Sequence, residues 1–240
     1  MVIKAANLHF SELRDKINAC PVGAHIRIED CLGQRYIASG HSADIEIIGT
    51  PGNALGAYLA GGKIVVRGSA QDATGDTMDD GEIVIYGSSG DATGYAMRGG
   101  RIFVRDNAGY RAGIHMKAYG EKIPVIVIGG RGGYFLGEYQ AGGKIIVLGL
   151  NTDGKPVVGE YCGTGMHGGE IVIRSRALPP NLPPQVTAAV ATAEDMKDIV
   201  PEIKAYCKYF SIEPKKVLDA DFFILRPNTA NPYKQLYTYN

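Results

Sequence analysis

The sequence predicts an all-β fold: a single-stranded parallel β-helix of about seven coils, each of about 19 residues. Three observations predict it. Short runs of β-branched residues recur, glycines flank each run, and neighbouring runs keep a constant spacing, as at Ile64, Ile83 and Ile102. A fixed period indicates stacked repeats, and short β-branched runs between glycines indicate that each repeat contributes a strand.

The repeats occupy the middle of the 240-residue chain, between about residues 44 and 174. We therefore expect an N-terminal cap (1–40), a β-helix (41–176) and a C-terminal segment (177–240) made of a proline-rich connector, a helix and a docking tail. A left-handed helix of hexapeptides is the alternative. It requires about 18 residues per coil and a six-residue subrepeat, and the sequence keeps neither.

The chain contains 33 glycines, about twice the usual share. Their repeated positions predict tight corners with positive φ and close approach of neighbouring coils. A nucleotide-binding loop would need a long helix after the glycines, so we interpret them as structural. The glycines that keep the register are Gly56, Gly62, Gly75, Gly81, Gly94, Gly100, Gly113, Gly137, Gly143 and Gly169.

Side chains alternate along a strand, so the middle residue of each apolar run should point out of the coil. That residue is apolar in every copy, which predicts an apolar stripe along the stack. Either the C-terminal segment covers it or a partner protein docks on it, and an isolated chain could self-associate through it. Lys63, Glu82 and Arg101 flank the stripe and should pair across the strands. The stripe consists of Val65, Val84, Phe103, Ile126, Ile146 and Val172.

No residue pattern predicts a catalytic, cofactor-binding or metal site. Asp72 and Asp91 lie in two DATG motifs, which fit either a calcium site or hydrogen bonds to the backbone of the turn. Cys162 could be a nucleophile, but no base accompanies it, so a buried thiol is the simpler interpretation. No histidine has a partner at triad or ligand-pair spacing, and the four cysteines include no CxxC pair for zinc or an iron–sulfur cluster.

Both ends are expected to add structure to the stack. Residues 7–20 predict a short helix capped by Ser11, and 24–30 and 35–40 predict two weak strands that close one end. Residues 192–210 predict an amphipathic helix, and Pro201 leaves one helix or two equally open. The aromatic tail that follows should dock onto another surface.

Composition excludes several classes of partner. The 25 basic and 25 acidic side chains balance, so the sequence has no electrostatic footprint for nucleic acid or an anionic membrane. The N-terminal residues show no apolar signal sequence, and no run of about 18 apolar residues predicts a membrane span. We expect a cytoplasmic protein with reduced cysteines.

Three consecutive repeats read GNALGAYLAGGKIVVRG, DATGDTMDDGEIVIYG and DATGYAMRGGRIFVRD. They resemble the G-XX-G-XXX-G repeats in the C-terminal domain of glutamate synthase large subunits. The last part of the chain, FFILRPNTANPYKQLY, resembles the close of stand-alone versions of that domain. One of the subunits of formylmethanofuran dehydrogenase is similar in the repeats.

The resemblance implies a right-handed β-helix that acts as a non-catalytic scaffold in a glutamate synthase-like complex. In that enzyme, a glutaminase (amidotransferase) part releases ammonia from glutamine, and a part with FMN and an iron–sulfur cluster uses it to convert 2-oxoglutarate to glutamate. Here both would be separate subunits, because residue 2 is Val2 rather than the cysteine nucleophile and no cysteine cluster is present. A scaffold in a formylmethanofuran dehydrogenase complex is the alternative, and a β-helix polysaccharide lyase is a more distant one.

Overall fold

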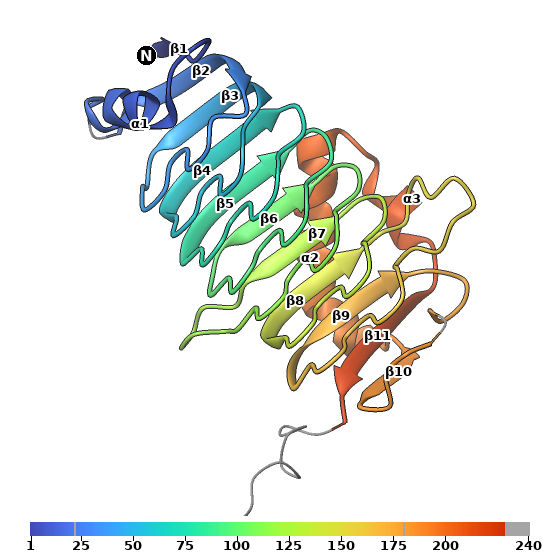
Figure 1. Ribbon diagram of the computed structural model, residues 1–240. Coiled ribbons are helices and arrows are strands. Elements are labelled where there is room, and N and C mark those ends of the chain that lie inside the picture. Colours follow the sequence, from blue (N-terminus) through green and yellow to red (C-terminus); the bar gives the residue numbers. More distant parts are fainter. Residues whose placement is uncertain (22, 180, 229–240) are drawn as a thin grey trace, which may run out of the picture.

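The computed structural model describes residues 1–21, 23–179 and 181–228. Their strands form one sheet in the order β1-β2-β3-β4-β5-β6-β7-β8-β9-β11-β10 (Figure 1). Strands β1 to β9 are parallel, whereas β11 runs antiparallel to both β9 and β10. The strands are β1 (Val2–Lys4), β2 (His25–Leu32), β3 (Asp44–Thr50), β4 (Ala60–Arg67), β5 (Asp80–Ile85), β6 (Arg101–Val104), β7 (Val125–Ile128), β8 (Ala141–Val147), β9 (Gly168–Arg174), β10 (Val186–Val190) and β11 (Phe222–Pro227). The helices are α1 (Phe10–Asn18), α2 (Ala193–Phe210) and α3 (Pro214–Leu218).

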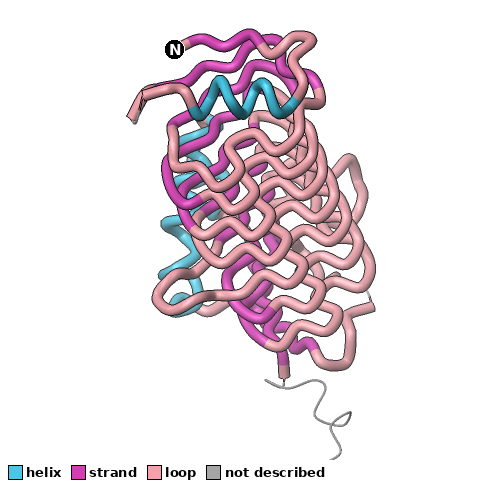
Figure 2. Tube along the Cα trace, turned by 60° about the vertical axis from the view of Figure 1, so that its left-hand side comes forward, coloured by secondary structure: helices cyan, strands magenta, loops and turns pink. Residues whose placement is uncertain are grey.

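The prediction of a β-helix is wrong. The strands of the described residues make one open sheet that does not close on itself. Each repeat contributes one strand and then returns through a layer of turns on the opposite side of the stack (Figure 2). In that layer the pairing is reduced to isolated bridges, such as those of Ser89 with Ala70 and with Ala108.

Backbone conformation explains why the turn layer contains no continuous strands. Alternate residues of a return have positive φ, as at Ala92 (54°), Gly94 (71°) and Ala96 (49°). Left-handed residues at this spacing fold the chain into consecutive turns, which cannot form an extended ladder. Backbone hydrogen bonds join neighbouring returns instead, as from Gly94 N–H to the Thr74 carbonyl at 2.7 Å. Positive φ occurs at every predicted structural glycine: Gly56, Gly62, Gly75, Gly81, Gly94, Gly100, Gly113, Gly137, Gly143 and Gly169.

The main core lies between the sheet and the turn layer. The strands contribute a fully buried row of isoleucines, of which Ile64, Ile83 and Ile102 stack in register. The turn layer contributes buried methionines such as Met78 and Met97. Each repeat therefore buries its apolar side chains against its neighbours as well as within itself, as stacked repeats must.

The assignment of Ile126 to the outward stripe is wrong. Strand β7 pairs Ile126 with Ile102 and Val127 with Phe103, so Ile126 lies in the core and Val127 points outward. The repeat is longer at this step because residues 118–124 form an added loop. A slip of one residue exchanges the two faces of a strand, and the apolar run alone did not reveal it.

The ends of the chain follow the prediction in part. Helix α1 begins at Phe10, so Ser11 lies inside the helix rather than at its cap. Residues 35–40 form turns instead of the predicted strand, whereas β2 is present. Helix α2 continues through Pro201 as a single helix. The antiparallel strands β10 and β11 were not predicted, and the last part of the docking tail, 229–240, lies outside the described residues.

Candidate functional site

The outward face of the sheet changes character along the stack. One outward-pointing residue of each strand from β2 to β9, and one of β11, lies at the same level, and we name this row the outer column. Its first two members are charged and carry ion pairs, whereas the other seven are apolar. The outer column consists of Arg27, Glu46, Val65, Val84, Phe103, Val127, Ile146, Val172 and Ile224.

Helix α2 covers the apolar part of the outer column (Figure 1). Its buried residues Ile199, Ile203 and Tyr206 belong to a second core with Phe103, which has no exposed surface. The Tyr206 hydroxyl donates to the Arg105 carbonyl at 2.9 Å, and burial raises the pKa of this phenol. Apart from Ile126, which lies in the main core, the predicted stripe is therefore covered by the chain's own C-terminal segment.

The charged residues beside the outer column form ion pairs, but not all with the neighbours expected. Lys63 contacts Glu82 at 3.4 Å across the strands. Arg101 instead binds Glu202 of α2 at 2.9 Å, and Glu82 accepts a hydrogen bond from Tyr209 of the same helix. These charges fasten α2 to the sheet as well as pairing strands.

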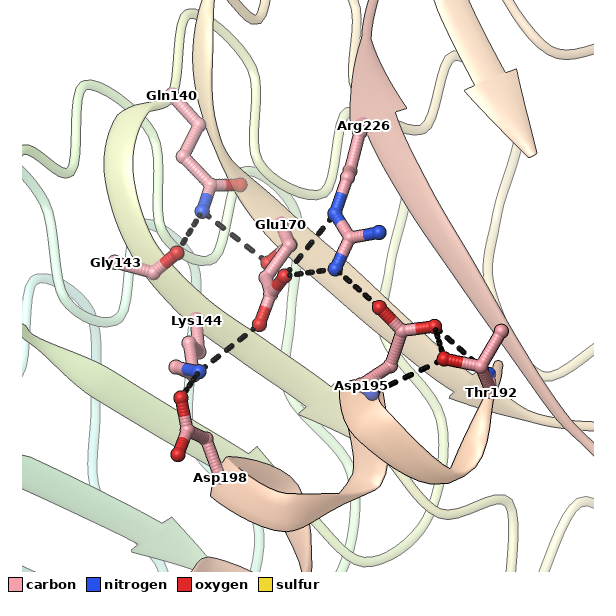
Figure 3. Close-up of polar contacts among 8 residues, drawn as sticks. All are labelled: Gln140, Gly143, Lys144, Glu170, Thr192, Asp195, Asp198 and Arg226. Atoms are coloured by element: carbon pink, nitrogen blue, oxygen red, sulfur yellow. Dashed lines mark hydrogen bonds and ion pairs between the residues drawn. The ribbon is translucent and has the colours of Figure 1, made fainter. Parts of the chain in front are cut away.

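A polar network ties the beginning of α2 and strand β11 to strands β8 and β9 (Figure 3). Arg226 is its centre, because its guanidinium binds Glu170 at 2.9 Å and Asp195 at 2.7 Å. Lys144 binds the other oxygen of Glu170 at 3.1 Å. We name this network the clasp. Its members are Lys144, Glu170, Thr192, Asp195, Asp198 and Arg226.

Asp195 has two tasks in the clasp. Its carboxylate accepts hydrogen bonds from the hydroxyl and the backbone N–H of Thr192, both at 2.7 Å, while the Thr192 hydroxyl caps the helix. These bonds and the one from Arg226 hold the pKa of Asp195 well below its usual range. The arrangement pairs every charge that it brings together, so it is suited to fastening rather than to proton transfer.

Gln140 lies beside the clasp, at the position in the repeat where others carry Met97 or Met116. Its side chain is fully buried, and its Nε2 donates to the Gly143 carbonyl at 3.0 Å. Its Oε1 has no hydrogen-bond partner among the described residues.

The structure gives structural surroundings to the residues of the sequence that could have carried chemistry, Cys162, Asp72 and Asp91. Cys162 is buried in the main core, and burial raises the pKa of its thiol to about 12, which disfavours the nucleophilic thiolate. Asp72 accepts a hydrogen bond from Asp91 N–H at 2.9 Å, and Asp91 accepts one from Tyr110 N–H at 2.8 Å. The DATG carboxylates therefore bind the backbone of the next repeat. In residues 1–21, 23–179 and 181–228, no group of three or more His, Cys, Asp or Glu side chains could hold a metal ion.

The turn layer, on the opposite side from α2, carries a group of aromatic rings that the sequence reasoning missed. His115 and Tyr139 stack with their centroids 5.2 Å apart, and Phe135 and Tyr161 stack at 4.9 Å. Tyr110 and Tyr134 meet edge to face at 5.4 Å. We name this group the aromatic patch. It consists of Tyr95, Tyr110, His115, Tyr134, Phe135, Tyr139 and Tyr161.

The aromatic patch is partly exposed, and its rings contact one another. Tyr110 and Tyr161 retain about half of their surface, at 51% and 48%. Arg111 lies over the Phe135 ring at 4.9 Å and binds Glu138 at 2.9 Å, which holds the guanidinium in place. Tyrosine, arginine and other aromatic residues are enriched at the centres of protein interfaces. The patch is therefore the strongest candidate for a docking surface.

The profile of the GXGXG motif family matches residues 11–227, nearly the whole chain. The chain belongs to the GXGXG motif family. A relative from Methanocaldococcus jannaschii, named Uncharacterized protein MJ1350, is 45% identical over 251 aligned positions, which cover 99% of this chain and 96% of the relative. The GXGXG motif is found in the C-terminal region of glutamate synthase large subunits, so the family relation to that enzyme holds for this chain.

The alignment of the GXGXG repeats explains why the sequence did not predict the aromatic patch. Most of its rings occupy positions of the repeat that carry smaller side chains in the preceding copies, such as Ala92 and Asp91. Aligning the copies for what they share therefore hides what the later copies add.

None of the helices in the described ranges is long and apolar enough to cross a membrane.

Proposed function

We propose that this GXGXG chain is a scaffolding subunit of a glutamate synthase-like complex, in the stand-alone form of the domain. The family relation supports the assignment to this complex. The ordered stack, with paired or buried polar groups in place of reactive ones, supports a role in holding other subunits. The chain would contribute no catalytic group to the conversion of glutamine and 2-oxoglutarate to glutamate.

The partners in this proposal are a cytoplasmic glutaminase subunit and a subunit that carries FMN and an iron–sulfur cluster. The aromatic patch is the observation that carries the proposal. It presents several half-exposed rings on one side of the stack, held by stacking and by Arg111. Rigid aromatic side chains lose little conformational entropy on binding, which suits them to anchor a partner.

Co-purification from the native cells tests both parts of the proposal. A tagged wild-type chain should elute with a glutaminase and with a protein that has the absorbance spectrum of bound FMN. Tyr110→Ala combined with Tyr134→Ala should weaken the complex by about 2 kcal/mol or more, because interface hot spots of this kind contribute that much. Tyr119→Ala is the matched control, since Tyr119 is 71% exposed on the 118–124 loop, outside the aromatic patch.

Two results would contradict the proposal. Elution with a subunit that binds a molybdenum or tungsten pterin would assign the chain to a formylmethanofuran dehydrogenase-type complex instead. Equal recovery of partners by the double variant and the Tyr119→Ala control would remove the aromatic patch as the docking surface.

A further inference from the structure

The sheet ends at β10, and this strand presents an unpaired edge. Strand β10 pairs with β11 on one side, and no strand of the described residues lies on its other side (Figure 1). Val190 is 62% exposed there. The opposite edge of the sheet is different, because β1 has only three residues. An unpaired strand edge is a template for pairing with another chain.

The hydrogen bonds of neighbouring residues show which backbone groups of β10 are unpaired. Ala191 N–H donates to the Phe222 carbonyl, and Asn228 N–H donates to the Gln185 carbonyl, both at 2.8 Å. In an antiparallel pair, alternate residues exchange hydrogen bonds with the partner strand. The residues in phase with Gln185 and Ala191 therefore bond β11. The backbone N–H and C=O groups of Ala188 and Val190 point away from it, toward the open edge.

The edge lacks the usual devices that prevent pairing. Strand β10 reads VTAAV, with no charged residue, no proline and no bulge. The sequence also reads nearly the same in both directions, with a valine at each end and Ala188 at the centre. An antiparallel copy centred on Ala188 would place Val186 of one chain opposite Val190 of the other. The strand is therefore complementary to itself, which is the requirement for a two-fold interface.

We propose that two copies of this chain associate through β10, antiparallel and centred on Ala188, so that their sheets become continuous. The outward N–H and C=O groups of Ala188 in each copy would bond each other. Ala188 pairs with Leu225 on the core side of β11, so Val186, Ala188 and Val190 share that side. Pairing would cover Val190 and extend the apolar end of the main core into the partner.

Disulfide cross-linking tests both the edge and its register. Paired residues of this kind lie about 5.5 Å apart between Cα atoms, within the range that a disulfide spans. Ala188→Cys should give a covalent dimer under mild oxidation. Thr187→Cys is the matched control, because residue 187 would lie opposite residue 189 of the partner rather than opposite itself. Wild-type protein, with its four native cysteines, sets the background.

Oligomeric state in solution gives a second measurement. Light scattering should give twice 25.6 kDa for the wild-type chain. Ala188→Pro removes an outward N–H that β11 does not use, and proline is tolerated on an edge strand when its missing N–H faces outward. This variant should raise the dimer dissociation constant at least about tenfold while the far-UV circular dichroism spectrum of the folded chain stays unchanged, because each copy loses one donor.

A wild-type chain that is monomeric, or one whose Thr187→Cys variant cross-links as well as Ala188→Cys, would overturn the proposal. A dimer that appears only after truncation at Asn228 would also overturn it for the full chain, since residues 229–240 would then occupy the edge. The proposal is independent of the scaffolding function, because the aromatic patch and β10 are separate surfaces.

Discussion

At the scale of single residues, the direction of the Cβ atom decides where the turn layer needs glycine. Ala92 and Gly94 both have positive φ. A Cβ added at Gly94 would lie 2.4 Å from Ile126 Cδ1 in the core, whereas the side chain of Ala92 is partly exposed. Glycine is therefore required at Gly94 by space as well as by backbone. At Ala92 an L-residue is tolerated with some strain.

Substitutions at Gly94 and Ala92 should therefore differ in their effect on stability. Gly94→Ala should lower the free energy of unfolding by about 2–4 kcal/mol, through a strained φ and overpacking of the core. Ala92→Gly should raise it or leave it within about 1 kcal/mol, because relief of left-handed strain offsets the greater freedom of glycine when unfolded. Urea denaturation of both variants measures the difference. Equal destabilisation by the two would contradict the steric explanation.

At the scale of secondary structure elements, α2 and β11 are held by two different kinds of contact. The apolar face of α2 packs on the outer column, and the clasp fixes its first turn to β11 and β9. Helix α2 was predicted from its apolar periodicity, and its cap is readable in the sequence as Thr192 followed three residues later by Asp195. The pairing of β11 with β9 could not be predicted, because it joins residues about 50 positions apart in the sequence.

The clasp should make stability depend on acid. The pKa of Asp195 is lowered in the folded state, so its contribution is complete above the unfolded value of about 3.9 and is lost as the pH falls through the folded value. The melting temperature of Asp195→Asn should be lower than that of the wild type at pH 7, and the gap should narrow steadily as the pH falls below about 4. Asp198→Asn is the control: its carboxylate joins the clasp only through a 3.4 Å pair with Lys144 and is 79% exposed, so its melting temperature should stay close to that of the wild type. A gap that widens in acid would contradict the assignment.

At the scale of the whole molecule, the period sets the architecture, and one departure from it is informative. The sequence predicts the repeats, their strands and their glycines, because these depend on local spacing. It does not reveal that the return segment of each repeat forms turns instead of strands, because the glycines are compatible with both conformations. The 118–124 loop breaks the period without breaking the stack, since β7 still pairs in register with both β6 and β8.

Shortening that loop should therefore be harmless only at one length. Replacing 118–124 by Gly-Gly restores the 19-residue spacing and should change the melting temperature little, since the loop contributes mainly exposed ion pairs such as Lys122 with Asp80. Replacement by a single glycine would tend to shift β7 by one residue and turn Ile126 outward. That variant should lose several kcal/mol or fail to fold. Similar melting temperatures for the two variants would show that the flanking turns absorb the missing residue, and would contradict the explanation by strand register.

The length of helix α2 limits the number of apolar strands that it can cover. Its 18 residues make a rod of about 27 Å. The row of apolar side chains from Val65 to Val172 crosses six strands, whose five spacings of about 4.8 Å span about 24 Å. A duplicated repeat in the middle of the stack would thus expose one apolar strand that α2 is too short to cover. Repeats can be added without such exposure only at the first strands, where Arg27 and Glu46 face the solvent side.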